Sequence, residues 1–168
     1  MSVRQFRRKG FSDAVQGALA LSGLAPRYLE LEITESVLME QSQKSIAELE
    51  ALSGLGVRLC IDDFGTGYSG LSYLKRLPVH RLKIDQSFVR DIVRDPNDAA
   101  IVSAVIALSR SLGLKVTAEG VETEAQLKFL LAHACNEAQG YYFSMPVPAE
   151  EVVNSLTPRN SQRMRRQA

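Results

Sequence analysis

Hydrophobic residues recur along this chain with two different spacings. Some segments place an apolar residue at every third or fourth position, as Ile101, Val105 and Leu108 show, which predicts an amphipathic helix. Other segments are short and almost continuously apolar, which is typical of buried strands. The pattern predicts helices at 12–21, 42–53, 69–77, 98–112, 124–134 and from Pro148 onward, and strands at 27–34, 57–64, 79–85, 114–120 and 138–143.

Several residues mark where these elements are expected to begin or end. Ser12 can cap the first helix through its side-chain oxygen, and Gly23 follows its last turn, where a left-handed backbone is often needed. Pro78 stops the third helix and Gly113 ends the longest one. Pro148 stands at a first helical position, which tolerates proline.

The predicted elements alternate between strand and helix, with a repeat of roughly 30 residues, the size of a strand–helix–strand unit. This order favours an α/β fold in which helices cover a parallel sheet. Two architectures fit it, an open doubly wound sheet and a (β/α)8 barrel. A closed barrel needs eight strands and typically about 250 residues. Five predicted strands in 168 residues therefore make an open sheet or part of a barrel.

Composition narrows the class of protein. With 45% hydrophobic and 23% charged residues, the chain has the balance of a soluble globular domain. A formal net charge of +1 gives no overall attraction to nucleic acid or to an anionic membrane. No apolar run is long enough to span a bilayer, and the basic start MSVRQFRRKGF has no apolar segment of a secretory signal behind it. These features favour a cytoplasmic location.

Two features of the chain have simple interpretations. Cys60 and Cys135 lack the paired spacing of a metal site, and Cys60 lies in a predicted buried strand, where a reduced and inert thiol is expected. Residues 157–168 are rich in arginine and have little to bury, so we expect a disordered tail. A weak phosphate-binding role is the alternative for this tail.

Charged or amide side chains stand near the C-terminal end of nearly every predicted strand. In a parallel α/β sheet these ends lie at one edge, where ligands bind. We therefore expect these side chains to meet, although each lies on a different strand. The group consists of Glu32, Asp62, Asp63, Lys83, Glu119 and Gln139, the last of them at the start of the final strand.

The charges of this group do not balance. Lys83 supplies one positive charge against the carboxylates of Glu32, Asp62, Asp63 and Glu119. Burying unpaired carboxylates is unfavourable, and divalent cations could supply the missing charge. All-oxygen ligands suit Mg²⁺, Mn²⁺ or Ca²⁺, and a pair of such ions about 4 Å apart is a usual arrangement for cleaving phosphodiesters. The alternative is a structural salt-bridge network around Lys83.

Four motifs resemble those of one protein family. ELEITES (30–36), CIDDFGTGYSGLSYLKRLPVHRLKIDQSFVRD (60–91), TAEGVET (117–123) and QGYYFSMPVP (139–148) are similar, in order and spacing, to the EAL domain, the bacterial cyclic-di-GMP phosphodiesterase. The resemblance runs from about residue 2 to residue 156. It implies a (β/α)8 barrel of EAL type, incomplete here, with about strands 4 to 8 and the end of strand 3, so that residues 1–156 form a partial domain.

The resemblance implies metal ligands and a loop anchor. Glu32 resembles a metal-binding glutamate, Asp62 a carboxylate shared between two metals, and Asp63 a ligand of the second metal. Glu35 is similar to the glutamate that anchors the following loop, here residues 65–70. The implied cofactor is Mg²⁺ or Mn²⁺ in a two-metal site.

The resemblance also implies roles in the reaction. Lys83 is similar to the lysine that holds the attacking water, and Glu119 resembles the general base. Glu122 and Gln139 resemble supporting residues of the site and of the substrate pocket. The implied reaction is hydrolysis of one phosphodiester bond of cyclic-di-GMP to give linear pGpG. The implied partners are a second copy of the chain and an upstream sensory or diguanylate-cyclase domain in a longer parent protein.

One part of the family pattern is absent. The Glu-Ala-Leu tripeptide and a metal-binding asparagine belong before Met1, so two ligands of the first metal are missing from this chain. Without its first strands a barrel would expose two edges and an apolar interior. We therefore expect a marginally stable chain that dimerises or aggregates. It would be a fragment or a misplaced start, a decayed gene product, or a short protein that completes its barrel with a partner.

Three functions remain open at this point. The first is a cyclic-di-GMP phosphodiesterase domain, impaired in this chain. The second is a degenerate EAL module that binds cyclic-di-GMP or a protein partner without catalysis. The third is a structural remnant without a ligand. Retention of Lys83 and Glu119 favours the enzyme, because a domain selected only for binding needs no general base.

Overall fold

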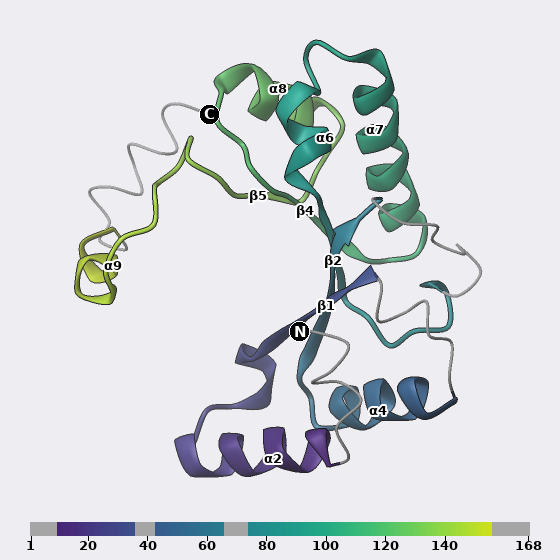
Figure 1. The fold of residues 1–168 in the computed structure, drawn as a ribbon, viewed down its shortest axis with the longest axis vertical. Helices are drawn as coiled ribbons and strands as arrows, with labels where there is room; N and C mark the ends of the chain where they lie inside the picture. The colour runs from purple at the N-terminus through teal and green to yellow at the C-terminus, as the bar shows by residue number, and fades with distance from the viewer. Residues whose placement is uncertain (1–9, 36–42, 66–73, 156–168) are drawn as a thin grey trace.

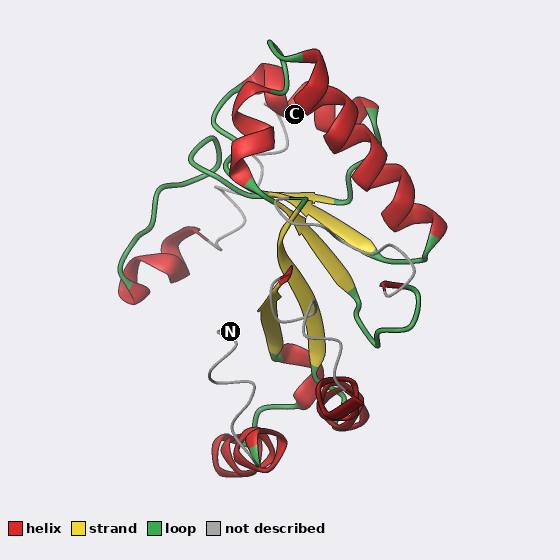
Figure 2. Cartoon of the chain, turned by 45° about the vertical axis from the view of Figure 1, so that its right-hand side comes forward, coloured by secondary structure: helices red, strands yellow, loops and turns green. Residues whose placement is uncertain are grey.

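A computed structural model of the chain describes residues 10–35, 43–65 and 74–155. Its centre is one parallel sheet in which the strands lie in sequence order (Figures 1 and 2). A doubly wound sheet reverses its strand order at a switch point, whereas a barrel adds each strand beside the previous one. The observed order therefore matches an arc of a barrel. The strands are β1 (Glu30–Thr34), β2 (Arg58–Phe64), β3 (Arg81–Ile84), β4 (Lys115–Ala118) and β5 (Glu137–Ala138).

Helices gather around both ends of this arc. Figure 1 shows α6, α7 and α8 together near β4 and β5, α2 and α4 near β1, and α9 apart from the other helices. Apolar side chains of α4 and α7, such as Leu49, Leu52 and Val102, are buried in the core that covers the sheet. The helices are α2 (Phe11–Ser22), α4 (Gln43–Gly54), α6 (Gln86–Asp91), α7 (Pro96–Ser111), α8 (Glu124–Ala132) and α9 (Ala149–Ser155), with a 3-10 turn at Pro26–Tyr28.

The two faces of the sheet differ in polarity. Side chains alternate between the faces of a strand, and paired residues of parallel strands point the same way. The buried apolar residues of β1 to β4 therefore share one face, under the helices: Ile33, Leu59, Ile61, Leu82, Ile84, Val116 and Ala118. The other face, called the polar face below, carries Glu30, Glu32, Thr34, Arg58, Cys60, Asp62, Arg81, Lys83, Lys115 and Thr117. The expectation of an exposed apolar barrel interior is wrong for these strands.

Two predicted boundaries need correction near the start. Ser12 does not cap α2: the cap position is Gly10, and the backbone N–H of Ser12 donates to Glu48 Oε1 at 2.7 Å. Gly23 does end this helix, with a left-handed φ of 66°. The first strand begins at Glu30 rather than at residue 27, because Pro26 opens the 3-10 turn that precedes it.

Further differences lie around β3 and after β5. Helix α6 was not predicted; Asp85 caps it by accepting a hydrogen bond from the N–H of Ser87 at 2.8 Å. Helix α7 begins two residues earlier than predicted because Asp95 caps it. The last strand ends at Ala138, so Gln139 follows it instead of starting it. Most of the predicted helix at 69–77 and the tail at 157–168 lie outside the described residues.

Two expectations about composition can be compared with the structure. Cys60 is fully buried and forms no disulfide, and burial raises the pKa of its thiol to about 12, which agrees with the expected reduced thiol. Within the three described ranges, none of the helices has both the length and the apolar character that crossing a bilayer requires.

Candidate active site

Lys83 lies at the centre of the charged residues that the sequence analysis grouped. Its side chain is buried, and its Nζ lies 2.7 Å from Glu32 Oε1, 3.1 Å from Asp62 Oδ1 and 2.6 Å from Glu119 Oε1. Burial alone would lower the pKa of this lysine, but its close contacts with the three carboxylates outweigh burial and raise the pKa. The ammonium group is therefore charged and joins β3 to carboxylates of three other strands, those of Glu32, Asp62 and Glu119.

A β-bulge explains why two adjacent aspartates belong to one site. Neighbours in a regular strand point to opposite faces. The pairing of β2 with β3 is irregular between Ile61 and Phe64. Here Asp62 and Asp63 together stand opposite Lys83, and Asp63 has a left-handed φ of 55°. Aspartate tolerates this backbone better than most residues, and bulges often re-aim side chains beside active sites.

Three carboxylates of this site are close enough to share one cation. One oxygen each from Asp62, Asp63 and Glu119 lie within 4.8 Å of one another. Asp62 Oδ1 is buried, and its contact with Lys83 is an ion pair rather than a well-directed hydrogen bond. An all-carboxylate donor set suits a hard divalent cation, so these residues fit the group that the sequence predicted. Glu32 is not one of these three carboxylates: it pairs with Lys83, and its side chain is 45% exposed.

The pKa values of Glu119 and Asp63 are both raised, which disfavours their charged forms. Burial raises the pKa of Glu119, and the hydrogen bond from Lys83 offsets this only in part. Burial, the charge of Asp62 and contact with Asp85 raise the pKa of Asp63. One lysine therefore does not neutralise the site, and a bound cation would relieve the remaining repulsion.

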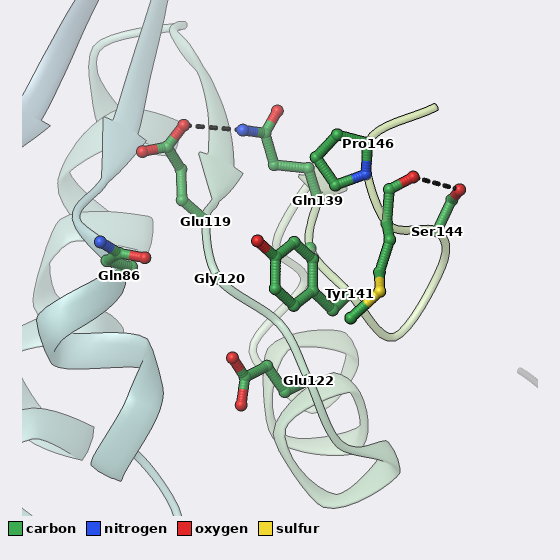
Figure 3. A pocket seen from close by; sticks show the side chains of 10 residues that line it. Gln86, Glu119, Gly120, Glu122, Gln139, Tyr141, Ser144 and Pro146 are labelled. Atoms are coloured by element: carbon green, nitrogen blue, oxygen red, sulfur yellow. Dashed lines mark hydrogen bonds between the residues drawn. The ribbon is translucent and has the colours of Figure 1, made fainter. Parts of the chain in front are cut away.

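Glu119 is held in place by a residue from the next strand. It follows β4, and its backbone N–H donates to the carbonyl of Ile84 at 3.2 Å. The side-chain amide of Gln139 donates to Glu119 Oε1 at 2.8 Å (Figure 3). Gln139 is itself fixed by its backbone N–H, which donates to the carbonyl of Ala118 at 2.9 Å. The orientation of this carboxylate thus depends on the position of β5.

Asp85 is a site residue that the sequence analysis did not select. Its carboxylate caps α6 and also lies close enough to Asp63 to raise the pKa of that carboxyl group. Hydrogen bonds from Ser87 and Asp63 outweigh burial and lower the pKa of Asp85. Its place at the end of a predicted strand, followed two residues later by a serine, was a helix-cap signal that could have identified it.

The predicted loop anchor is close to its expected partner. The side chain of Glu35 is buried just after β1, and the backbone N–H of Gly65 donates to Glu35 Oε2 at 3.2 Å. This bond joins the end of β1 to the chain that leaves β2. The remainder of the predicted loop, residues 66–70, lies outside the described residues.

A pocket of about 490 Å³ opens beside Glu119 (Figure 3). Glu122 and Gln139, both predicted as pocket residues, line it, and Tyr141 with its apolar neighbour Met145 forms part of its wall. Gln86, Ser144 and Pro146, which also line it, were not predicted. The aromatic and proline residues of the motif QGYYFSMP could have identified this wall, since ligand pockets combine apolar surface with a few polar groups.

Comparison with known proteins identifies the family. A family model described as the EAL domain matches residues 1–146. MucR of Pseudomonas aeruginosa, a bifunctional diguanylate cyclase/cyclic di-GMP phosphodiesterase, is 51% identical over 156 residues, which cover 93% of this chain and 23% of MucR. The cyclic di-GMP phosphodiesterase NbdA of the same organism is 52% identical over 141 residues, which cover 84% of this chain and 18% of NbdA. The chain thus spans less than a quarter of either relative.

Solved structures agree with this assignment. The PaMucR phosphodiesterase in its c-di-GMP complex superposes with a TM-score of 0.87 at 51% identity, over 90% of this chain and 62% of that one. Klebsiella pneumoniae BlrP1, solved in calcium/cy-diGMP and manganese/cy-diGMP complexes, has a TM-score of 0.78 at 35% identity, over 84% of this chain and 36% of that one. These matches confirm the predicted barrel-type α/β fold. This chain belongs to the EAL domain family.

Proposed function

We propose that this chain carries the catalytic face of a cyclic-di-GMP phosphodiesterase, which hydrolyses one phosphodiester bond to give linear pGpG. The observation that carries the proposal is the convergence of Asp62, Asp63, Glu119 and Lys83 beside an open pocket. Relatives named as cyclic di-GMP phosphodiesterases, at 51% and 52% identity, support the choice of substrate.

The carboxylates are proposed to hold divalent cations, Mg²⁺ or Mn²⁺. Glu32, Asp62 and Asp63 are the assigned ligands, and the distance of Glu119 from the two aspartates would let it contribute to the same site. Bound divalent cations would supply positive charge for the substrate phosphate and make a neighbouring water more acidic. The manganese and calcium complexes of BlrP1 support a divalent cation at such a site.

The protein side chains supply orientation and proton transfer. Lys83 Nζ lies among the carboxylates, where it can donate a hydrogen bond to the attacking water. Glu119, whose pKa is raised by burial, accepts the proton of this water, while the amide of Gln139 fixes the direction of its carboxylate. Glu35 holds the start of the loop after β2, and Glu122 lines the pocket for the nucleotide.

We also propose that the chain acts in a cytoplasmic assembly, as a homodimer and together with a sensory or diguanylate-cyclase domain. The name of MucR, which couples cyclase and phosphodiesterase activities in one protein, supports the second association. Sedimentation analysis of the chain over a range of concentrations would test the first. A monomer at every concentration would contradict it.

Replacement of the proposed base tests the function. The 168-residue chain, shown to be folded by circular dichroism, is assayed for pGpG release with Mg²⁺ or Mn²⁺. In Glu119→Gln we expect turnover to fall by at least about 100-fold, the scale of lost general-base catalysis, while cyclic-di-GMP binding measured by calorimetry persists. Glu124→Gln, an exposed change on α8, is the control and keeps full turnover. Tight binding without turnover in the parent would favour a non-catalytic module instead.

A further inference from the structure

A second group of polar side chains lies on the polar face, toward the starts of the strands. We call it the lower tier; it consists of Glu30, Arg81, Thr117 and Glu137. Each lies two residues before an active-site residue, and these are Glu32, Lys83, Glu119 and Gln139 in turn. Two residues are one repeat of a strand, about 6.6 Å along its axis. The lower tier therefore forms the floor of the active site.

Arg81 makes all the ion-pair and hydrogen-bond contacts that join the lower tier. Its Nε lies 3.2 Å from Glu30 Oε2, and its Nη1 donates to Thr117 Oγ1 at 2.7 Å. Both terminal nitrogens donate to the carboxylate of Glu137, with Nη2 3.1 Å from Oε1. A paired contact of this kind fixes orientation as well as distance. The side chain of Arg81 is 12% exposed, so solvent screens these contacts only in part.

The contacts of Arg81 with Glu30 and with Glu137 join strands that are not neighbours. The sheet order puts β2 between Arg81 and β1, and β4 between Arg81 and β5. Among the described residues, β5 pairs with β4 at two positions, Glu137 and Ala138. Such a short strand has little ladder to hold it. The two-nitrogen contact of Arg81 with Glu137, called the fork below, therefore adds to the ion pair of Lys115 with Glu137 at 3.5 Å and to the backbone hydrogen bonds of Gln139 in fixing β5, the strand that precedes Gln139.

We infer that Arg81 is a positioning residue of the active site. By holding Glu137 and, through Glu30, the start of β1, it sets the point from which Gln139 donates to Glu119. Its effect on turnover rests on the proposed function. Its effect on the hydrogen bond between Gln139 and Glu119 does not, because that bond is present in the protein without substrate.

The structural part is tested by NMR on the 168-residue chain. The side-chain amide resonances of Gln139 are assigned by their disappearance in Gln139→Ala, and their position without the carboxylate partner is taken from Glu119→Ala. In Arg81→Lys, which keeps the charge but not the fork, we expect them to move toward that position. Arg58→Lys, at an exposed start of β2, is the matched control and leaves them unmoved. Unmoved resonances in a folded Arg81→Lys would overturn the inference.

Turnover supplies a second test. We expect Arg81→Lys to lower kcat for cyclic-di-GMP about tenfold, the scale for residues that orient catalytic groups, with KM nearly unchanged. Because Arg81 acts through Gln139, the double variant with Gln139→Ala is no slower than Gln139→Ala alone. Additive losses would overturn the inference.

Glu137→Gln removes the same fork and replaces Arg81→Lys if that variant does not fold. A folded parent without turnover would contradict the proposed function, and the Gln139 resonances would then decide this inference alone.

Discussion

At the scale of single residues, Lys83 holds together groups that would otherwise repel one another. Three carboxylates lie within 3.1 Å of its Nζ, and two of them, Asp62 and Glu119, also lie within 4.8 Å of each other and of Asp63. Removing one partner of a buried ion pair is usually far more damaging than replacing the whole pair, because the remaining charges stay unpaired. The same reasoning makes a bound cation a substitute for the lysine.

We therefore expect Lys83→Met to lose about 2 kcal/mol of stability in chelator, less than for a fully buried pair because Glu32 is partly exposed. Added Mn²⁺ should raise the melting temperature of the variant more than that of the parent. Differential scanning calorimetry with and without the metal measures both effects. Lys128→Met, in an exposed pair with Glu124, is the control and should change stability little. Equal stability of Lys83→Met and the parent in chelator would contradict the prediction.

At the scale of elements, the turn after β5 shapes both the pocket and the surroundings of Glu119, the proposed base. The carbonyl of Gln139 accepts from the N–H of Val121 at 3.0 Å, and the N–H of Tyr142 donates back to the carbonyl of Val121 at 2.9 Å. Between them Gly140 has a φ of 152°, and a Cβ placed there would lie 2.3 Å from both the N and the O of Val121. Only glycine allows the two backbones to approach this closely.

Gly140→Ala should therefore destabilise the chain by about 1–3 kcal/mol, as overpacking does, and weaken nucleotide binding in the adjacent pocket. Gly17→Ala is the matched control. Gly17 lies within α2, and a Cβ placed there has nothing within 4 Å. This substitution should raise the free energy of unfolding by about 0.5–1 kcal/mol, because alanine favours a helix more than glycine does. Urea unfolding of both variants measures the contrast. A stabilised Gly140→Ala would show that this close approach is not required.

The missed helix α6 belongs to the same scale. Its sequence is short and has no clear apolar period, so it exists because Asp85 caps it and because Val89 is buried in the core. Within the described residues, sequence patterns predicted the order of the other strands and helices correctly, and erred at their ends, where capping and tertiary contacts decide. Gln139 is an example: aromatic residues typical of a strand continue past Ala138, but the strand ends there and the chain turns at Gly140 against Val121.

At the scale of the whole molecule, charged side chains tie the strands of the polar face together. Hydrogen bonds from Arg81 lower the pKa of Glu137 below its ordinary value of 4.5. A carboxyl group with a lowered folded-state pKa adds stability above its unfolded pKa, and this stability is lost as the pH falls through the folded value. The lower tier should therefore stabilise the chain at neutral pH and cease to do so in acid.

Glu137→Gln should be less stable than the parent at pH 7, and the difference should shrink as the pH falls below 4.5. Melting temperatures of the two proteins between pH 3 and pH 7, measured by circular dichroism, give this difference directly. Glu50→Gln, an exposed change on α4, is the control and should follow the parent throughout. A difference that is constant with pH would show that the ion pair does not stabilise the fold.

The sequence by itself determined which charged groups the site contains and the order of the strands and helices. It supplied the carboxylates, the lysine and the alternation of strands and helices, because residue type and local spacing are properties of the chain alone. Only the tertiary structure decided that Asp62 and Asp63 face the same side, that Asp85 touches Asp63, and that the open face of the sheet is polar. These facts depend on a bulge and on the register between strands, which arise when distant segments pair and which no local pattern contains.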